Sequence, residues 1–174
     1  MTAPAPTALT AYLRFMRAAK MRPETIRGRR VTLQRIERSI GPLAHVTAAR
    51  LIKWQADRAD QVGVVSLIGE ISALRCFFAW AQESGVRRDN PATRLRPPRK
   101  PRAVPRPITE DALGDALAAA DNVTRAILAL AAMAGLRACE IAELGWADVD
   151  LSGQVLTVVD GKGGHSRRVP MSPQ

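Results

Sequence analysis

An arginine and a glutamate one helical turn apart form the first candidate site. Arg137 follows a predicted glycine turn at Gly135 and begins a short predicted helix, directly after an almost wholly apolar stretch. A guanidinium held partly buried in such a frame needs an anionic partner, and Glu140 can supply it. The pair is either a structural ion bridge or an arrangement in which Glu140 orients Arg137, so that its remaining donors face a phosphate.

A lysine at the tip of a glycine-rich turn is the second candidate. Lys162 lies in the segment 160–164, between strands predicted at 154–159 and 166–170. A side chain at such a tip reaches a ligand without moving a core. The turn alone is a weak signal, and it is not a P-loop, because Gly163 follows the lysine where that motif needs Ser or Thr.

Two helices and this hairpin must position these residues. Thr109-Glu-Asp predicts the start of one helix, and residues 123–133 predict a second that is apolar almost all round and therefore buried. Together with the hairpin, residues 108–174 are predicted to form an α+β unit. One hairpin is little for a self-sufficient mixed domain, so we expect this unit to be incomplete.

Upstream, the apolar spacing is helical throughout and predicts four helices over residues 1–92. The first covers roughly residues 9–16, and the second runs from Pro23 to the Gly41-Pro42 break. The third begins after Thr47 as N-cap and carries Leu51, Ile52 and Trp54, and the fourth runs from about Val64 to a C-cap at Gly85. Their predicted apolar positions include Leu9, Tyr12, Leu13, Phe15, Met16, Ile26, Val31, Leu33, Ile36, Leu51, Ile52 and Trp54. Tyr12, the single tyrosine, is expected in the core and not in catalysis.

The charge of the chain favours an acidic polymer as partner. Lys and Arg number 26 against 16 Asp and Glu, a net charge of +10. Residues 1–106 hold 21 of these cations and 7 acids, a net +14, whereas residues 107–174 hold 5 and 9, a net −4. Five prolines and six cations in residues 93–107 predict an extended basic linker, which is either a solvated spacer or, as we favour, a strap along a phosphate backbone.

Arginines also concentrate on the second predicted helix, where a merely solvated face is the alternative to a phosphate-facing surface. Aromatic residues make up only 4% of the chain, so duplex DNA is favoured over stacked single strands. The side chains expected to bind DNA are Arg27, Arg29, Arg30 and Arg35 in the helix and Arg94, Arg96, Arg99, Lys100, Arg102 and Arg106 in the linker.

Other classes of protein are disfavoured. No cofactor or metal is expected, because no cluster of His, Cys, Asp or Glu has ligand spacing. Cys76 and Cys139 suggest neither a zinc site nor a disulfide framework, and no signal segment or membrane span is recognisable. We therefore expect a cytoplasmic protein without membrane partners.

Two motifs together resemble the tyrosine recombinase (phage integrase) family. Gly135-Leu-Arg137-x-x-Glu140 continues through Leu144 to Trp146-x-Asp148, and Gly161-Lys162-Gly-Gly-x-x-Arg-x-Val-Pro170 follows at the expected distance. The resemblance implies a mainly α fold with a small β-hairpin or sheet. It comprises a four-helix core-binding (SAM-like) domain at 1–92, a linker at 93–107 and the first part of an α+β catalytic domain at 108–174.

The resemblance also implies roles. The two domains would clamp duplex DNA, Arg137 would stabilise charge on the scissile phosphate with support from Glu140, and Lys162 would assist the leaving 5′ oxygen. The full-length form would cut and rejoin DNA through a 3′-phosphotyrosine and would form higher-order assemblies on DNA, in the cytoplasm of a bacterium or a phage-infected cell. The present chain is expected to be a monomer in solution.

The sequence departs from the family in one respect. The family's His-x-x-Arg box and late nucleophilic tyrosine are not found, and His165, followed by Ser-Arg-Arg inside the hairpin, cannot replace that box. We therefore expect a recombinase fragment that binds DNA without cleaving it. A non-catalytic DNA-binding regulator, either a repressor or a recombinase inhibitor, is the alternative.

Overall fold

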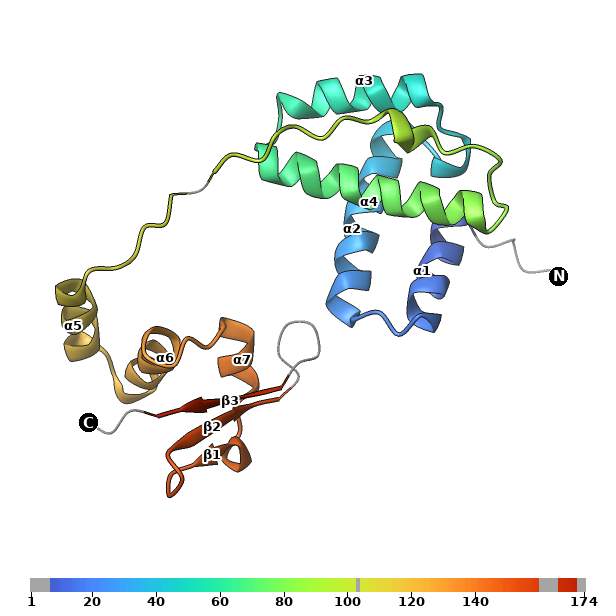
Figure 1. Cartoon of the computed structure of the whole chain (residues 1–174). Helices are drawn as coiled ribbons and strands as arrows, with labels where there is room; N and C mark the ends of the chain where they lie inside the picture. Colours follow the sequence, from blue (N-terminus) through green and yellow to red (C-terminus); the bar gives the residue numbers. More distant parts are fainter. Residues whose placement is uncertain (1–6, 103, 160–165, 172–174) are drawn as a thin grey trace. The chain divides into compact units, whose positions relative to one another are not determined.

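The chain divides into two compact units, residues 1–103 and 104–174 (Figure 1). The computed structural model describes residues 7–102, 104–159 and 166–171. In these residues, four α-helices form the first unit, and the second combines three α-helices with a small antiparallel sheet. The predicted fold class, mainly α with a small sheet, is confirmed.

Threonine N-caps and glycines with positive φ mark several helix ends in the first unit. They are α1 (Ala8–Ala18), α2 (Pro23–Ile40), α3 (Ala48–Ala59) and α4 (Val64–Glu83), with 3₁₀ turns η1 (Leu43–His45) and η2 (Pro91–Arg94). The hydroxyls of Thr7 and Thr47 accept hydrogen bonds from first-turn amides of α1 and α3. Gly41 and Gly85 follow α2 and α4 with φ of 86° and 72°, a backbone conformation that glycine adopts without strain.

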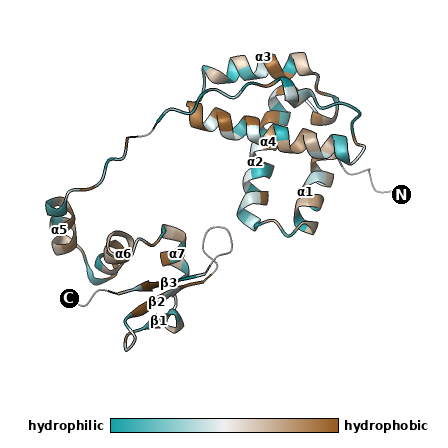
Figure 2. Ribbon diagram, viewed as in Figure 1, coloured by the Kyte–Doolittle hydropathy of each residue, from teal (hydrophilic) through white to brown (hydrophobic). Residues whose placement is uncertain are grey.

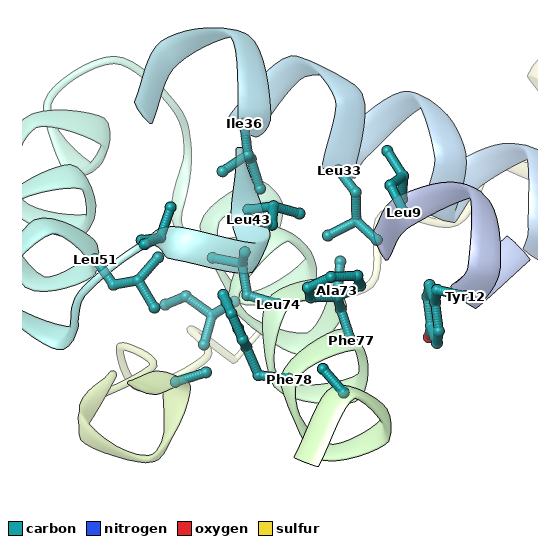
Figure 3. Packing of buried hydrophobic residues seen from close by; sticks show 14 of the residues in the cluster. Leu9, Tyr12, Leu33, Ile36, Leu43, Leu51, Ala73, Leu74, Phe77 and Phe78 are labelled. Atoms are coloured by element: carbon teal, nitrogen blue, oxygen red, sulfur yellow. The ribbon is translucent and has the colours of Figure 1, made fainter. Parts of the chain in front are cut away.

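The core of the first unit is built around α4, and Figure 2 shows brown, hydrophobic residues along this helix. Figure 3 shows Phe77 and Phe78 of α4 packed among Leu33 of α2, Leu43 of η1 and Leu51 of α3, and all five side chains are fully buried. By length and composition α4 could cross a membrane, but half of that stretch is buried inside the unit. Its apolar character therefore reflects its central place in the core.

The predicted core positions are only partly confirmed. Tyr12 is 3% exposed and sets its ring edge-on against Phe77, as expected for a core residue. Phe15, Val31 and Ile52 were expected on the apolar stripes but are about half exposed. They lie at the margins of those stripes, and only the centre of each stripe faces the neighbouring helices.

The second unit contains α5 (Glu110–Ala119), α6 (Asn122–Ala132), α7 (Ala138–Glu143), η3 (Trp146–Asp148) and strands β1 (Val149–Asp150), β2 (Val155–Val158) and β3 (Arg167–Pro170). Thr109 caps α5 as predicted. Strands β2 and β3 form the predicted antiparallel pair, with Leu156 opposite Val169. The two-residue strand β1 pairs with β2 and was not predicted, because so short a segment carries no alternation pattern.

The core of the second unit is small, and the prediction for α6 is wrong. Leu136, Leu156 and Val158 are its buried apolar residues in the described part of the unit. Helix α6 contains no buried residue, and Val123 and Ile127 are 71% and 45% exposed. Its neighbours here, α5 and α7, cover only part of a helix that is apolar all round.

Candidate functional site

Arg137 and Glu140 meet at the start of α7. Gly135, with φ of 64°, makes the turn, and buried Leu136 anchors the chain before the helix. The backbone N–H of Arg137 donates to Glu140 Oε2 at 2.8 Å, and its guanidinium Nη1 donates to Oε1 at 3.0 Å. The Glu140 side chain is only 4% exposed. The predicted pair therefore exists and closes the first turn of α7.

A third residue, Arg167 of β3, completes this cluster. Its two terminal guanidinium nitrogens donate to the two carboxylate oxygens of Glu140, both at 2.8 Å. Such a two-point contact fixes both groups in orientation as well as position. Arg167 is the arginine of the hairpin motif, but no role was predicted for it from the sequence. Arg167 and Val169 are two residues apart in a strand, so their side chains lie on the same face. Because Val169 packs on the small core of this unit, this spacing is the signal that could have placed Arg167 on the inner face.

The two arginines keep Glu140 ionised and leave the cluster with a net positive charge. Hydrogen bonds from Arg167, and then from the backbone of Arg137, hold the pKa of Glu140 well below its usual value near 4.5. The Arg137 side chain is 55% exposed, more than the partly buried position that we expected. Its Nε and Nη2 make no hydrogen bond with the described residues, so they are available to an anion.

The lowered pKa of Glu140 predicts an acid-sensitive second unit. Because the folded-state pKa lies below the unfolded one, the cluster stabilises the unit above about pH 4.5 and loses this effect as the pH falls. Hydrogen-exchange protection of the β2 and β3 amides in the whole chain, corrected for intrinsic rates, should fall between about pH 5 and about pH 3. In Glu140→Gln this fall should be smaller.

Glu143→Gln is the matched control, because Glu143 is an exposed carboxylate on the same helix. It should show the pH dependence of the unaltered chain. Equal pH slopes for Glu140→Gln and Glu143→Gln would contradict the linkage.

The second candidate, Lys162, lies outside the described residues, as does His165. The strands on either side, β2 and β3, are paired in the register that places Val158 opposite Arg167. Through Arg167, its first residue, β3 is anchored to Glu140.

The predicted basic residues of α2 have different surroundings. Arg27 and Arg30 are exposed. Arg29 is half-buried, with its Nη2 3.5 Å from Cys76 Sγ. Arg35 is paired with Glu70 of α4, so its charge is not merely solvated. The acidic partner lies on another helix, where helical spacing along α2 could not reveal it.

The basic segment, residues 93–107, begins as part of the first unit. Arg94 belongs to η2, and Leu95 is fully buried in the core, where its carbonyl accepts a hydrogen bond from Arg75. The amide of Arg96 donates to Gln55 Oε1 at 3.1 Å. Packing of the first unit therefore continues past residue 92, and all six cations from Arg94 to Arg106 are exposed.

Comparison with known structures identifies the class of fold. The chain is similar to lambda integrase, solved as a tetramer bound to a Holliday junction, with a TM-score of 0.78 and 20% sequence identity. The similarity covers 96% of this chain and 50% of that one. The fold is therefore that of the DNA integrases.

Sequence comparison names the family. Residues 106–174 match the phage integrase family. The chain is 32% identical to the tyrosine recombinase XerD of Neisseria meningitidis, over 89% of this chain and 56% of that protein. It is 31% identical to XerC of Chromobacterium violaceum, over 96% and 58%. This chain belongs to the tyrosine recombinase family, and it spans a little over half the length of these relatives.

Proposed function

We propose that this chain is the DNA-clamping part of a site-specific recombinase whose full-length form cuts and rejoins DNA through a 3′-phosphotyrosine. The observation that carries the proposal is the buried Glu140, which holds a half-exposed Arg137 in one orientation. In phosphoryl transfer the transition state spreads negative charge over the phosphate oxygens. Fixed cations stabilise that charge without a metal.

Each residue of the cluster then has a role. Arg137 contacts the scissile phosphate, and Glu140 and Arg167 position it. Lys162, on the hairpin that β2 and β3 support, assists the leaving 5′ oxygen. The exposed cations Arg27 and Arg30 and those of the basic segment contact the phosphate backbone.

The cytoplasm suits this function. Cys76 and Cys139 are free and exposed, a state that a reducing compartment preserves. Within the described residues, no group of three or more His, Cys, Asp or Glu is placed to hold a metal ion.

A binding assay tests the proposal together with an attempt to trap a covalent adduct. A labelled duplex should bind the chain, but a nicked duplex that traps phosphotyrosine intermediates should give no protein–DNA adduct on a denaturing gel. The physical reason is that Tyr12, the single tyrosine, is 3% exposed, and burial raises the pKa of its hydroxyl. A nucleophile needs access to the phosphate and an activated hydroxyl.

Tyr12→Phe is the control, because it removes the hydroxyl while keeping the ring in the core. It should bind the duplex as the unaltered chain does. An adduct with the unaltered chain that disappears in Tyr12→Phe would show that this chain is catalytic, and failure to bind any duplex would overturn the proposal as a whole.

A further inference from the structure

The first unit contains a second buried carboxylate held by two arginines. Glu70, in the middle of α4, is 4% exposed, although the other buried residues of that helix are all apolar. Arg35 Nη2 donates to Glu70 Oε1 at 2.6 Å. Arg58 donates twice, from Nε to Oε2 and from Nη2 to Oε1, both at 3.0 Å. The arrangement repeats that of Glu140 with Arg137 and Arg167.

The two arginines at Glu70 are not equivalent. Arg58 is 20% exposed, and its third nitrogen, Nη1, donates to Gln61 Oε1 at 3.1 Å. Arg35 is 51% exposed and uses Nη2 alone, so Nε and Nη1 make no hydrogen bond with the described residues. Arg58 therefore uses all three of its nitrogens to hold Glu70 and Gln61. By contrast, Arg35 has two nitrogens that can donate hydrogen bonds to a ligand.

Arg35 and Arg58 stand where two grooves meet. A groove of about 690 Å³ between α2 and α3 is lined by both arginines and also by Arg50 and Lys53. A second groove, of about 570 Å³ between α2 and α4, is lined by the same two arginines and by Arg29. Cations outnumber acids along both grooves, which favours an anionic ligand.

Structural need alone does not account for this cluster. Replacing a buried ion triad by apolar residues of similar volume is often neutral or stabilising, because the charges must be desolvated. Two cations on one carboxylate also leave a net charge of +1 beside the grooves. That surplus charge contributes nothing to packing, but it attracts phosphate.

We propose that Glu70 and Arg58 are positioning residues that fix Arg35 as a phosphate contact of the first unit, with a phosphodiester of duplex DNA as its ligand. This inference rests on the proposed DNA-binding function. It adds a preset contact at the junction of the two grooves and assigns roles to Glu70 and Arg58, which the sequence did not suggest.

The first test uses the sign of an effect. Glu70→Gln raises the net charge of the chain by one, so a role in general electrostatics alone predicts tighter binding to a mixed-sequence duplex. If Glu70 positions Arg35, binding should instead weaken, by about tenfold, because a charge-assisted contact loses its orientation. Glu83→Gln, an exposed carboxylate on α4, makes the same charge change and should bind as tightly as the unaltered chain or more tightly. A folded Glu70→Gln that binds as tightly as Glu83→Gln would overturn the inference.

The second test does not depend on the folding of Glu70→Gln. Arg35→Ala should weaken binding by about tenfold and reduce the magnitude of the slope of log affinity against log salt by about 0.9, the value for one phosphate contact. Arg17→Ala removes an equal charge from an exposed position on α1, outside both grooves, and should leave that slope unchanged. Equal slopes for Arg35→Ala and Arg17→Ala would overturn the inference. Absence of duplex binding by the unaltered chain would instead overturn the proposed function.

Discussion

The affinity of this chain for duplex DNA is expected to fall by at least about a thousandfold between about 50 mM and about 200 mM salt. The cause is counterion release, because each phosphate that a side chain neutralises contributes about 0.9 to the slope of log affinity against log salt. Six exposed cations of the basic segment, from Arg94 to Arg106, set the minimum of the effect, to which contacts by Arg27, Arg30 and Arg35 would add. If each contacts one phosphate, the slope is about −5, and a fourfold rise in salt gives the stated loss.

Charge-matched variants locate the effect. Replacing Arg99, Arg102 and Arg106 together by Gln should reduce the magnitude of the slope by about 3. It should weaken binding equally on unrelated sequences, because backbone contacts position a protein without reading bases. The control replaces three exposed cations in and just after α1, which are Arg14, Arg17 and Lys20. Titrations by fluorescence anisotropy give both slopes, and equal slopes for the two triple variants would exclude the strap.

Phe77→Ala is expected to destabilise the first unit by about 4 kcal/mol, within the range for removing a fully buried aromatic side chain. The Phe77 ring lies edge-on to Tyr12 and Phe78, with centroids 5.4 and 5.1 Å away, and 5.9 Å from Trp80. Its removal leaves a cavity in the core that the rings of Tyr12, Phe78 and Trp80 line. Urea denaturation of the whole chain measures the loss.

Phe15→Ala is the control for this change. Phe15 contacts two of the same rings, Tyr12 at 6.4 Å and Trp80 at 6.1 Å, but is 47% exposed. Its removal should cost about 1 kcal/mol or less, because little apolar area leaves the core. Similar losses for Phe15→Ala and Phe77→Ala would mean that the ring contacts, and not burial, dominate the stability of the first unit.

The fold was largely predictable because its elements are encoded locally. Thr47 and Thr109 cap the helices that they were predicted to start, and Gly135 makes its turn. The exposure of α6 could not be predicted. An apolar sequence indicates that a helix favours burial, but it does not indicate whether other elements lie close enough to cover it.

The candidate site was predictable only in part. Arg137 and Glu140 are three residues apart, so helical geometry brings them together without help from the rest of the fold. Arg167 and Glu70 are long-range members of their clusters, paired across 27 residues and across 12 and 35. No local pattern encodes such pairs.

By itself the sequence determined the helices of the first unit, the strands of the hairpin, the division of charge near residue 106 and the motif that names the family. Only the tertiary structure decided how the charges are used. It buries two carboxylates and sets two arginines on each, which leaves Arg137 and Arg35 half exposed. The physical reason is that an ion pair depends on distance in space, and sequence spacing specifies that distance only within a single helix or hairpin.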